Sequence, residues 1–78
     1  MGRGLAALSN GRAADAVMAF RQVIALNPTH YGAHYQLAVA LDRAGKRDEA
    51  RLVWQRVLTM AEAYRDTATI RVARSRLR

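Results

Sequence analysis

The sequence predicts an all-α fold of antiparallel helix-turn-helix repeats, with about two repeats and a C-terminal capping helix. One observation is a repeat: the stretch GRAADAVMAFRQVIALNP at residues 11–28 returns as GKRDEARLVWQRVLTMAE at residues 45–62. The offset is Gly45 minus Gly11, or 34 residues, and a fixed period of this length is typical of repeat proteins. A second is composition, because 51% of the residues are hydrophobic but only 6% are aromatic. Small residues therefore supply much of the packing surface, which favours helix against helix.

The two copies agree at positions suited to packing. At the same offset a glycine matches a glycine, an acidic residue matches an acidic residue and an aromatic residue matches an aromatic residue. The matched pairs are Gly11 and Gly45, Asp15 and Glu49, Ala16 and Ala50, Phe20 and Trp54, Val23 and Val57, and Ile24 and Leu58.

The first repeat is predicted to hold two helices. A helix over residues 2–10 ends at Asn10-Gly11, because these residues readily adopt the left-handed conformation that closes a helix. The next runs over residues 13–26, and Pro28 ends it because proline cannot donate to the helix ladder. Its apolar residues recur at the spacing of one helical face: Ala16, Ala19, Phe20, Val23 and Ile24.

The second repeat is predicted to begin with Thr29 as the N-cap of a helix over residues 30–44. Gly45 closes this helix as Gly11 closed the first. Tyr35 and Val39 lie off its main apolar stripe, so they either pack against another layer or face a partner. The stripe itself consists of His34, Leu37, Ala38 and Leu41.

The fourth helix is predicted over residues 47–64, with Asp48 and Glu49 in its first turn, where the helix dipole favours negative charge. Its apolar face consists of Ala50, Val53, Trp54, Val57, Ala61 and Tyr64. Glu62 stands where the first copy has Pro28. The residues that follow predict a last amphipathic helix, with Asp66, Ile70, Ala73 and Leu77 on one side and a basic surface of Arg71, Arg74 and Arg78 on another.

A chain of 78 residues is expected to form a single domain. We divide it into repeat one at residues 1–28, truncated at its start, repeat two at residues 29–62, and a capping helix at residues 65–78. Two repeats are fewer than the three or more that such stacks usually need. Three explanations stay open: the chain belongs to a longer array, it forms a homo-oligomer, or the last helix completes the core.

Composition excludes several classes of protein. The absence of cysteine excludes a disulfide framework and a cysteine zinc site, and it fits a cytoplasmic location. The longest apolar runs have five residues, far short of the roughly 20 that span a membrane, so no membrane insertion is expected. The net charge of +7 attracts acidic partners of any kind without choosing among them.

No catalytic, cofactor or metal site is predicted. His30 and His34 have a spacing that can bind a metal when a third ligand is present, but we interpret His34 as a core residue and His30 as a turn residue. The glycine pattern that begins at Gly2 formally matches a dinucleotide-binding loop, yet no strand precedes it. The serines, histidines and carboxylates form no recognisable nucleophile or acid-base arrangement, so the chain is predicted not to be an enzyme.

The 34-residue helix pair resembles the tetratricopeptide repeat. The resemblance depends on glycine between the helices, alanine followed four residues later by an aromatic residue, and proline after the second helix. The matching residues are Gly4, Gly11, Ala16, Phe20 and Pro28 in the first copy and Leu37, Ala38, Gly45, Ala50 and Trp54 in the second. The chain departs from the family where His34 replaces a frequent tryptophan, where Val23 and Val57 replace alanine, and where Glu62 replaces proline.

The resemblance implies an adaptor in which the first helix of each repeat lines a groove for a peptide or a helix of a protein partner. The groove residues that it implies are Leu5, Leu8, Tyr35, Gln36, Val39, Asp42, Arg43, Thr69 and Ala73. Some members grip chaperone tails with Lys, Arg and Asn in the groove. This chain offers Leu5, Tyr35, Val39 and Thr69 instead, so no such clamp is predicted.

Two alternative functions stay open. The chain is an accessory segment of a larger, enzymatic protein, or it is a basic nucleic-acid-binding module. The second is disfavoured because aromatic residues are few and Trp54 is assigned to the core, which leaves little for bases to stack on.

Overall fold

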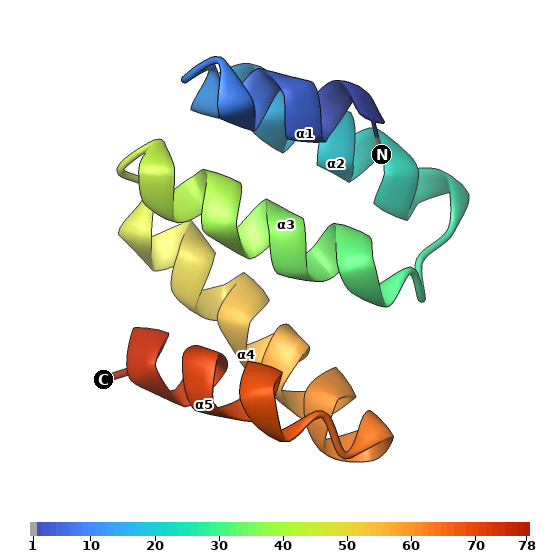
Figure 1. Ribbon diagram of the computed structural model, residues 1–78, viewed down its shortest axis with the longest axis vertical. Coiled ribbons are helices and arrows are strands. Elements are labelled where there is room, and N and C mark those ends of the chain that lie inside the picture. The colour runs from blue at the N-terminus through green and yellow to red at the C-terminus, as the bar shows by residue number, and fades with distance from the viewer. Residues whose placement is uncertain (1) are drawn as a thin grey trace.

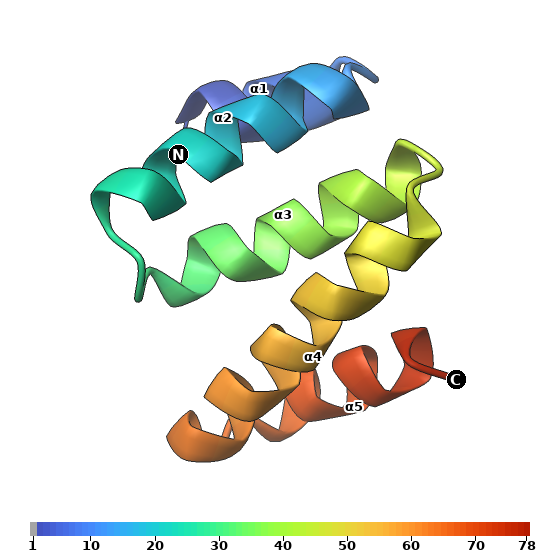
Figure 2. The same ribbon diagram turned by 180° about the vertical axis from the view of Figure 1, so that it is seen from behind.

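The computed structural model describes residues 2–78, and in this part of the chain it contains five α-helices and no strand. Each helix packs on the next in chain order, from α1 and α2 at one end to α5 at the other (Figure 1). Helices α1 and α5 lie on the viewer's side of α2 and α4, which come to the front when the molecule is turned round (Figure 2). The fold is therefore the predicted stack of helix pairs. The helices are α1 (Gly2–Ser9), α2 (Ala13–Leu26), α3 (Tyr31–Arg43), α4 (Arg47–Tyr64) and α5 (Thr67–Arg76).

The turn inside each helix pair is built in the same way in both copies. Gly11 has φ of 75° and Gly45 has φ of 78°, a left-handed conformation that suits glycine. The amide of Arg12 donates to the carbonyl of Ala7 at 2.7 Å, and the amide of Lys46, 34 residues later, donates to Leu41 at 2.9 Å. This bond across the glycine satisfies a carbonyl that the end of the helix would otherwise leave unpaired. The repeated glycine thus predicted both turns correctly.

The junctions that follow the two pairs differ. Helix α2 has 14 residues and stops before Pro28, whereas α4 has 18 residues and continues past Glu62. Arg65 then ends α4 with φ of 57°, in the left-handed region that glycine usually fills. As a result α5 begins at Thr67, and Thr67 minus Tyr31 is 36 residues, two more than the repeat period.

The predicted N-cap of α3 was wrong, and so was the predicted position of Asp66 on a side of the last helix. The N-cap of α3 is His30 instead of Thr29, since the Nδ1 atom of His30 accepts a hydrogen bond from the Ala33 amide at 3.0 Å. The hydroxyl of Thr29 instead donates to Asn27 at 3.3 Å. Asp66, assigned above to the apolar side of the last helix, is in fact its N-cap, because its side chain accepts from the Thr69 amide.

The core has one large aromatic residue from each repeat. Phe20 is 0% exposed and Trp54 is 1% exposed. Phe20 packs against Gly4, where a Cβ atom would lie only 2.4 Å from the ring, so the contact requires glycine. His34 is buried as predicted, and its Nε2 atom forms a hydrogen bond of 2.8 Å with the carbonyl of Pro28.

Candidate functional site

The residues of the predicted groove come from α1, α3 and α5, with α3 between the other two (Figure 1). Leu5 is 42% exposed and Arg43 is exposed, but Leu8 and Ala73 are buried and have almost no surface to offer a partner. The remaining residues are half-buried: Tyr35, Gln36, Val39, Asp42 and Thr69. We call the surface of Leu5, Tyr35, Gln36, Val39, Asp42, Arg43 and Thr69 the α1–α3–α5 face.

Tyr35 and Val39, which lie off the apolar stripe of their helix, are partly buried and partly exposed. Both pack against the core cluster while part of each side chain stays at the surface. The ring of Tyr35 meets Trp54 edge to face, with ring centroids 5.5 Å apart and planes at 86°. This geometry is favoured for aromatic pairs and fixes the tyrosine ring.

Asp42 has a structural partner that the sequence did not predict. The indole Nε1 of Trp54 donates to its Oδ2 at 2.8 Å, and the Nη1 of Arg76 lies 3.9 Å from the same oxygen. One carboxylate on α3 thereby connects the core tryptophan of α4 to the last turn of α5. The Oδ2 atom of Asp42 therefore has partners inside the molecule, so Asp42 supports the face as well as lining it.

Thr69 belongs to a second polar cluster at the start of α5. Its hydroxyl donates to Asp66 Oδ2 at 2.7 Å, and the hydroxyl of Tyr31 donates to the same oxygen at 2.8 Å. The Tyr31 ring also lies against that of Tyr64, with centroids 5.1 Å apart. These contacts hold the α4–α5 corner on the start of α3. The sequence analysis predicted neither the capping role of Asp66 nor its contact with Tyr31. An aspartate just before a helix is a recognisable N-cap signal, so the capping role could have been found.

The pKa values of Asp66 and Tyr31 are both shifted from their ordinary values. Hydrogen bonds from Thr69 and then from Tyr31 lower the pKa of Asp66, because they stabilise its charged form. Burial is the main cause that raises the pKa of Tyr31, with a contribution from its hydrogen bond to Asp66. The pair is therefore a neutral phenol donating to a carboxylate over the ordinary pH range.

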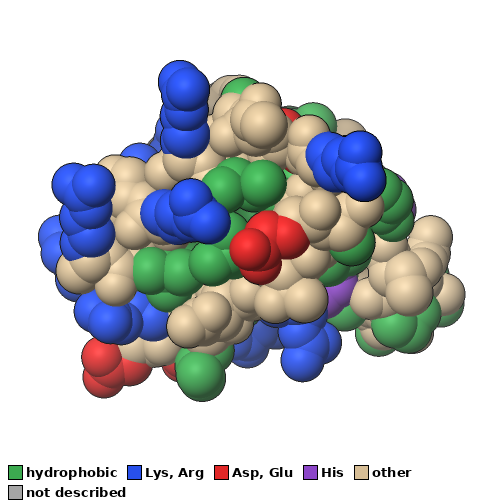
Figure 3. Space-filling model, turned by 90° about the horizontal axis from the view of Figure 1, so that it is seen from below, with side chains coloured by type: hydrophobic (Ala, Val, Ile, Leu, Met, Phe, Trp, Pro, Cys, Tyr) green, Lys and Arg blue, Asp and Glu red, His purple; other side chains and the backbone are tan. Residues whose placement is uncertain are grey.

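The basic surface predicted on the last helix is exposed at Arg71, Arg74 and Arg78. Seen from the end formed by α4 and α5, several Lys and Arg side chains lie near an apolar strip, and an acidic side chain lies directly against it (Figure 3). A single ion pair of 2.6 Å, between Arg21 and Glu49, connects α2 to α4, with both side chains about half exposed. Exposed pairs of this kind contribute little to stability.

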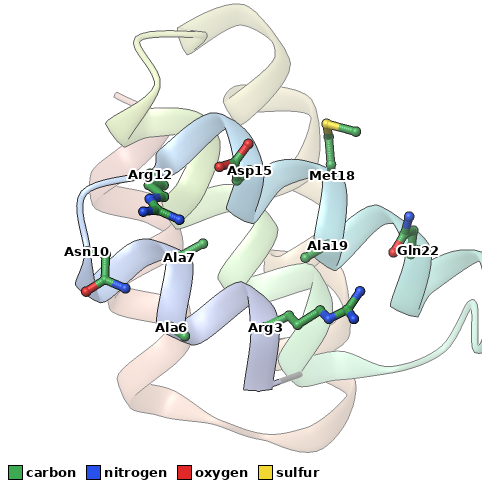
Figure 4. Close-up of a pocket in the computed structure, with 9 residues that line it drawn as sticks. All are labelled: Arg3, Ala6, Ala7, Asn10, Arg12, Asp15, Met18, Ala19 and Gln22. Atoms are coloured by element: carbon green, nitrogen blue, oxygen red, sulfur yellow. The ribbon is translucent and has the colours of Figure 1, made fainter.

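A shallow pocket of about 370 Å³ lies between α1 and α2 (Figure 4). Alanines form part of its wall, and the side chain of Arg3 extends toward Gln22. It brings together no nucleophile and base and no set of metal ligands. Its lining is Arg3, Ala6, Ala7, Asn10, Arg12, Asp15, Met18, Ala19 and Gln22.

Both histidines have structural contacts. Within residues 2–78, no three His, Asp or Glu side chains are grouped so that they could hold a metal ion. One ring nitrogen of His30 caps α3, and one of His34 binds the Pro28 carbonyl. None of the helices in residues 2–78 is long and apolar enough to cross a membrane.

Stacked helix pairs with a glycine turn, a small residue and a buried aromatic residue define an α-helical repeat protein. A family model of the tetratricopeptide repeat matches residues 7–66, and the chain belongs to this family. Comparison with curated proteins and with solved structures gave no match. Repeats of this family are typically non-catalytic protein-interaction modules, which indicates the general class of function.

Proposed function

We propose that the chain is a non-catalytic module that binds a peptide or a helix of a protein partner on the α1–α3–α5 face. The observation that carries the proposal is the position of Tyr35 and Val39. They lie one helical turn apart on the middle helix, and each keeps part of its apolar surface exposed while its base packs on the core.

Pre-organisation supports this assignment. A side chain that is already fixed loses little conformational entropy when a partner binds, and aromatic residues are frequent at the centre of interfaces. Tyr35 meets both conditions, because Trp54 holds its ring from one side. Gln36 and Arg43 add polar groups on the same helix that suit a peptide backbone or an acidic side chain.

Nucleic acid is a poorer fit to this face. Stacking of successive bases needs several accessible aromatic rings, and this face has only the partly exposed ring of Tyr35. The tryptophan is 1% exposed, with its Nε1 bound to Asp42. The polar and apolar groups of the α1–α3–α5 face suit polypeptide better.

The test is capture of partners by the wild-type chain and by a Tyr35→Ala, Val39→Ser double variant. A matched control is Met18→Ala, Leu52→Ser, because these apolar side chains are exposed on α2 and α4. We expect the first variant to lose the partner and the control to retain it, with both variants folded by circular dichroism. Equal retention by the two variants would contradict the proposal.

A further inference from the structure

A second concave site lies where the turn between α3 and α4 meets the end of α5. It has a volume of about 450 Å³, and most of its charged lining is cationic. We call it the arginine pocket. Its lining is Asp42 from α3, Arg47, Asp48 and Arg51 from α4, and Ser75, Arg76 and Arg78 from α5 and the residues after it.

The charges of the arginine pocket do not cancel. Four arginines and two aspartates give a net lining charge of four minus two, or +2. The Oδ2 atom of Asp42 accepts a hydrogen bond from Trp54 and lies 3.9 Å from Arg76. Asp48 lies in the first turn of α4, where the helix dipole stabilises it. Among residues 2–78, no carboxylate lies within ion-pair distance of Arg47 or Arg78.

Two of the arginines, Arg51 and Arg76, already have contacts within the molecule. Arg47 and Arg51 are one turn apart on α4 and thus lie on the same side of that helix. The Nη2 atom of Arg51 donates to the carbonyl of Leu77 at 3.2 Å, and Asp42 draws Arg76 toward the pocket. Two helices therefore direct guanidinium groups into one hollow, with donors left over for a ligand.

We infer that the arginine pocket binds the phosphate group of a phosphorylated side chain on a protein partner. A planar guanidinium matches two phosphate oxygens at once, and a phosphorylated residue carries a charge of about −1.5 to −2 near pH 7. The lining charge of +2 complements it. This inference rests on the proposed function, because the phosphate is carried by a polypeptide.

Two observations favour a peptide over nucleic acid as the carrier. No aromatic side chain lines the pocket, so a base has no ring to stack on. Asp42 belongs both to the pocket and to the α1–α3–α5 face, so a peptide on that face can reach the pocket without leaving the surface. Of the basic surface predicted from the sequence, only Arg78 lines the pocket, which makes this site distinct from the Arg71 and Arg74 side of α5.

The experiment measures binding by NMR titration of the arginine side chains at constant ionic strength. The probe is the blocked tripeptide Gly-phosphoserine-Gly, compared with its unphosphorylated form, inorganic phosphate and a ten-residue thymidine oligonucleotide. The variant Arg47→Gln, Arg51→Gln is matched to Arg56→Gln, Arg71→Gln, which removes the same charge at exposed positions outside the pocket. We expect the Kd for the phosphopeptide to rise at least tenfold in the first variant and less than twofold in the second.

Other results would overturn the inference. One is an equal loss of phosphopeptide affinity in both variants, and another is no phosphopeptide binding at low salt. The inference also fails if inorganic phosphate binds as tightly as the phosphopeptide, or if the oligonucleotide binds more tightly through the same arginines. Arg47→Gln alone repeats the test if the loss of the Arg51 bond to Leu77 reduces stability. The Tyr35→Ala, Val39→Ser variant should still bind the tripeptide, so a failure of the pocket is distinguishable from a failure of the face.

Discussion

Phe20 and Trp54 occupy the same position in the two repeats, and both are buried, but their surroundings differ. Phe20 packs on Gly4 with no polar contact, whereas Trp54 donates a hydrogen bond to Asp42 and supports Tyr35. The residue that corresponds to Asp42 in the first repeat is Leu8, since 42 minus 34 is 8. The first repeat therefore has an apolar contact where the second connects its core to the surface and, through Arg76, to α5.

The largest effect should follow the loss of either aromatic core. Trp54→Ala and Phe20→Ala should each cost about 3 to 5 kcal/mol in the free energy of unfolding, because each leaves a cavity. A loss of this size is enough to unfold a small domain. Thermal unfolding followed by circular dichroism measures it. A cost below about 1 kcal/mol for Trp54→Ala would contradict the packing of the second repeat.

The hydrogen bond from Trp54 to Asp42 distinguishes the second repeat from the first, and its loss should have the next largest effect on stability. Trp54→Phe should cost about 1.5 to 3 kcal/mol, because it removes a hydrogen bond to a charged group. Asp42→Leu gives the second repeat the leucine that the first repeat has at position 8. In a double-mutant cycle, the effects of Trp54→Phe and Asp42→Leu on the free energy of unfolding should be strongly non-additive. Additive costs would show that the Trp54 and Asp42 side chains are not coupled.

The first repeat has its own sensitive position at Gly4. Gly4→Ala should cost about 1 to 3 kcal/mol, because the added Cβ overlaps the Phe20 ring. Gly2→Ala is the matched control on the same helix, since nothing lies within 4 Å of its Cβ position. Chemical denaturation of both variants tests this, and equal stability of the two would refute the close contact.

The Asp66 cluster predicts a pH dependence. The folded pKa of Asp66 is below its unfolded value, so its stabilisation is fully present above the unfolded pKa, near 4, and is lost as pH falls through the folded pKa. Asp66→Asn should therefore flatten the acid side of the curve of melting temperature against pH. An unchanged slope between about pH 5 and pH 2 would argue against the cluster.

The smallest expected effect concerns the junction after the second repeat. Arg65→Gly should stabilise the fold by about 1 kcal/mol, because a non-glycine residue in the left-handed conformation is strained. Gly11→Ala should do the opposite at the turn inside the first pair, where glycine already has the left-handed conformation. Melting temperatures decide this, and a lower value for Arg65→Gly would contradict the strain at Arg65.

The sequence predicted the fold to within a few residues because its signals are local. Apolar spacing and the two glycines fixed the bounds of α2 and α4 as predicted, at Ala13–Leu26 and Arg47–Tyr64. The left-handed Arg65 was not predictable, because nothing in the chain marks an arginine for a conformation that glycine prefers. Thr29 was a reasonable N-cap by propensity, but His30 took that role because its Nδ1 atom reaches the Ala33 amide.

Much less of the candidate site could be predicted. The family resemblance chose the positions that line the α1–α3–α5 face, but burial depends on packing in three dimensions, and Leu8 and Ala73 proved to be buried. The hydrogen bond from Trp54 to Asp42 joins α4 to α3, and the arginine pocket collects side chains from α3, α4, α5 and Arg78. Residues distant in sequence come together there without a periodic signal.

Site-specific photo-crosslinking in cells tests directly whether a protein partner lies on the α1–α3–α5 face. A benzophenone amino acid replaces Val39 on the α1–α3–α5 face in one variant and Leu52, which is 74% exposed on α4, in the other. We expect a discrete crosslinked protein partner from position 39 and none from position 52. Crosslinks from position 52 alone would contradict this expectation.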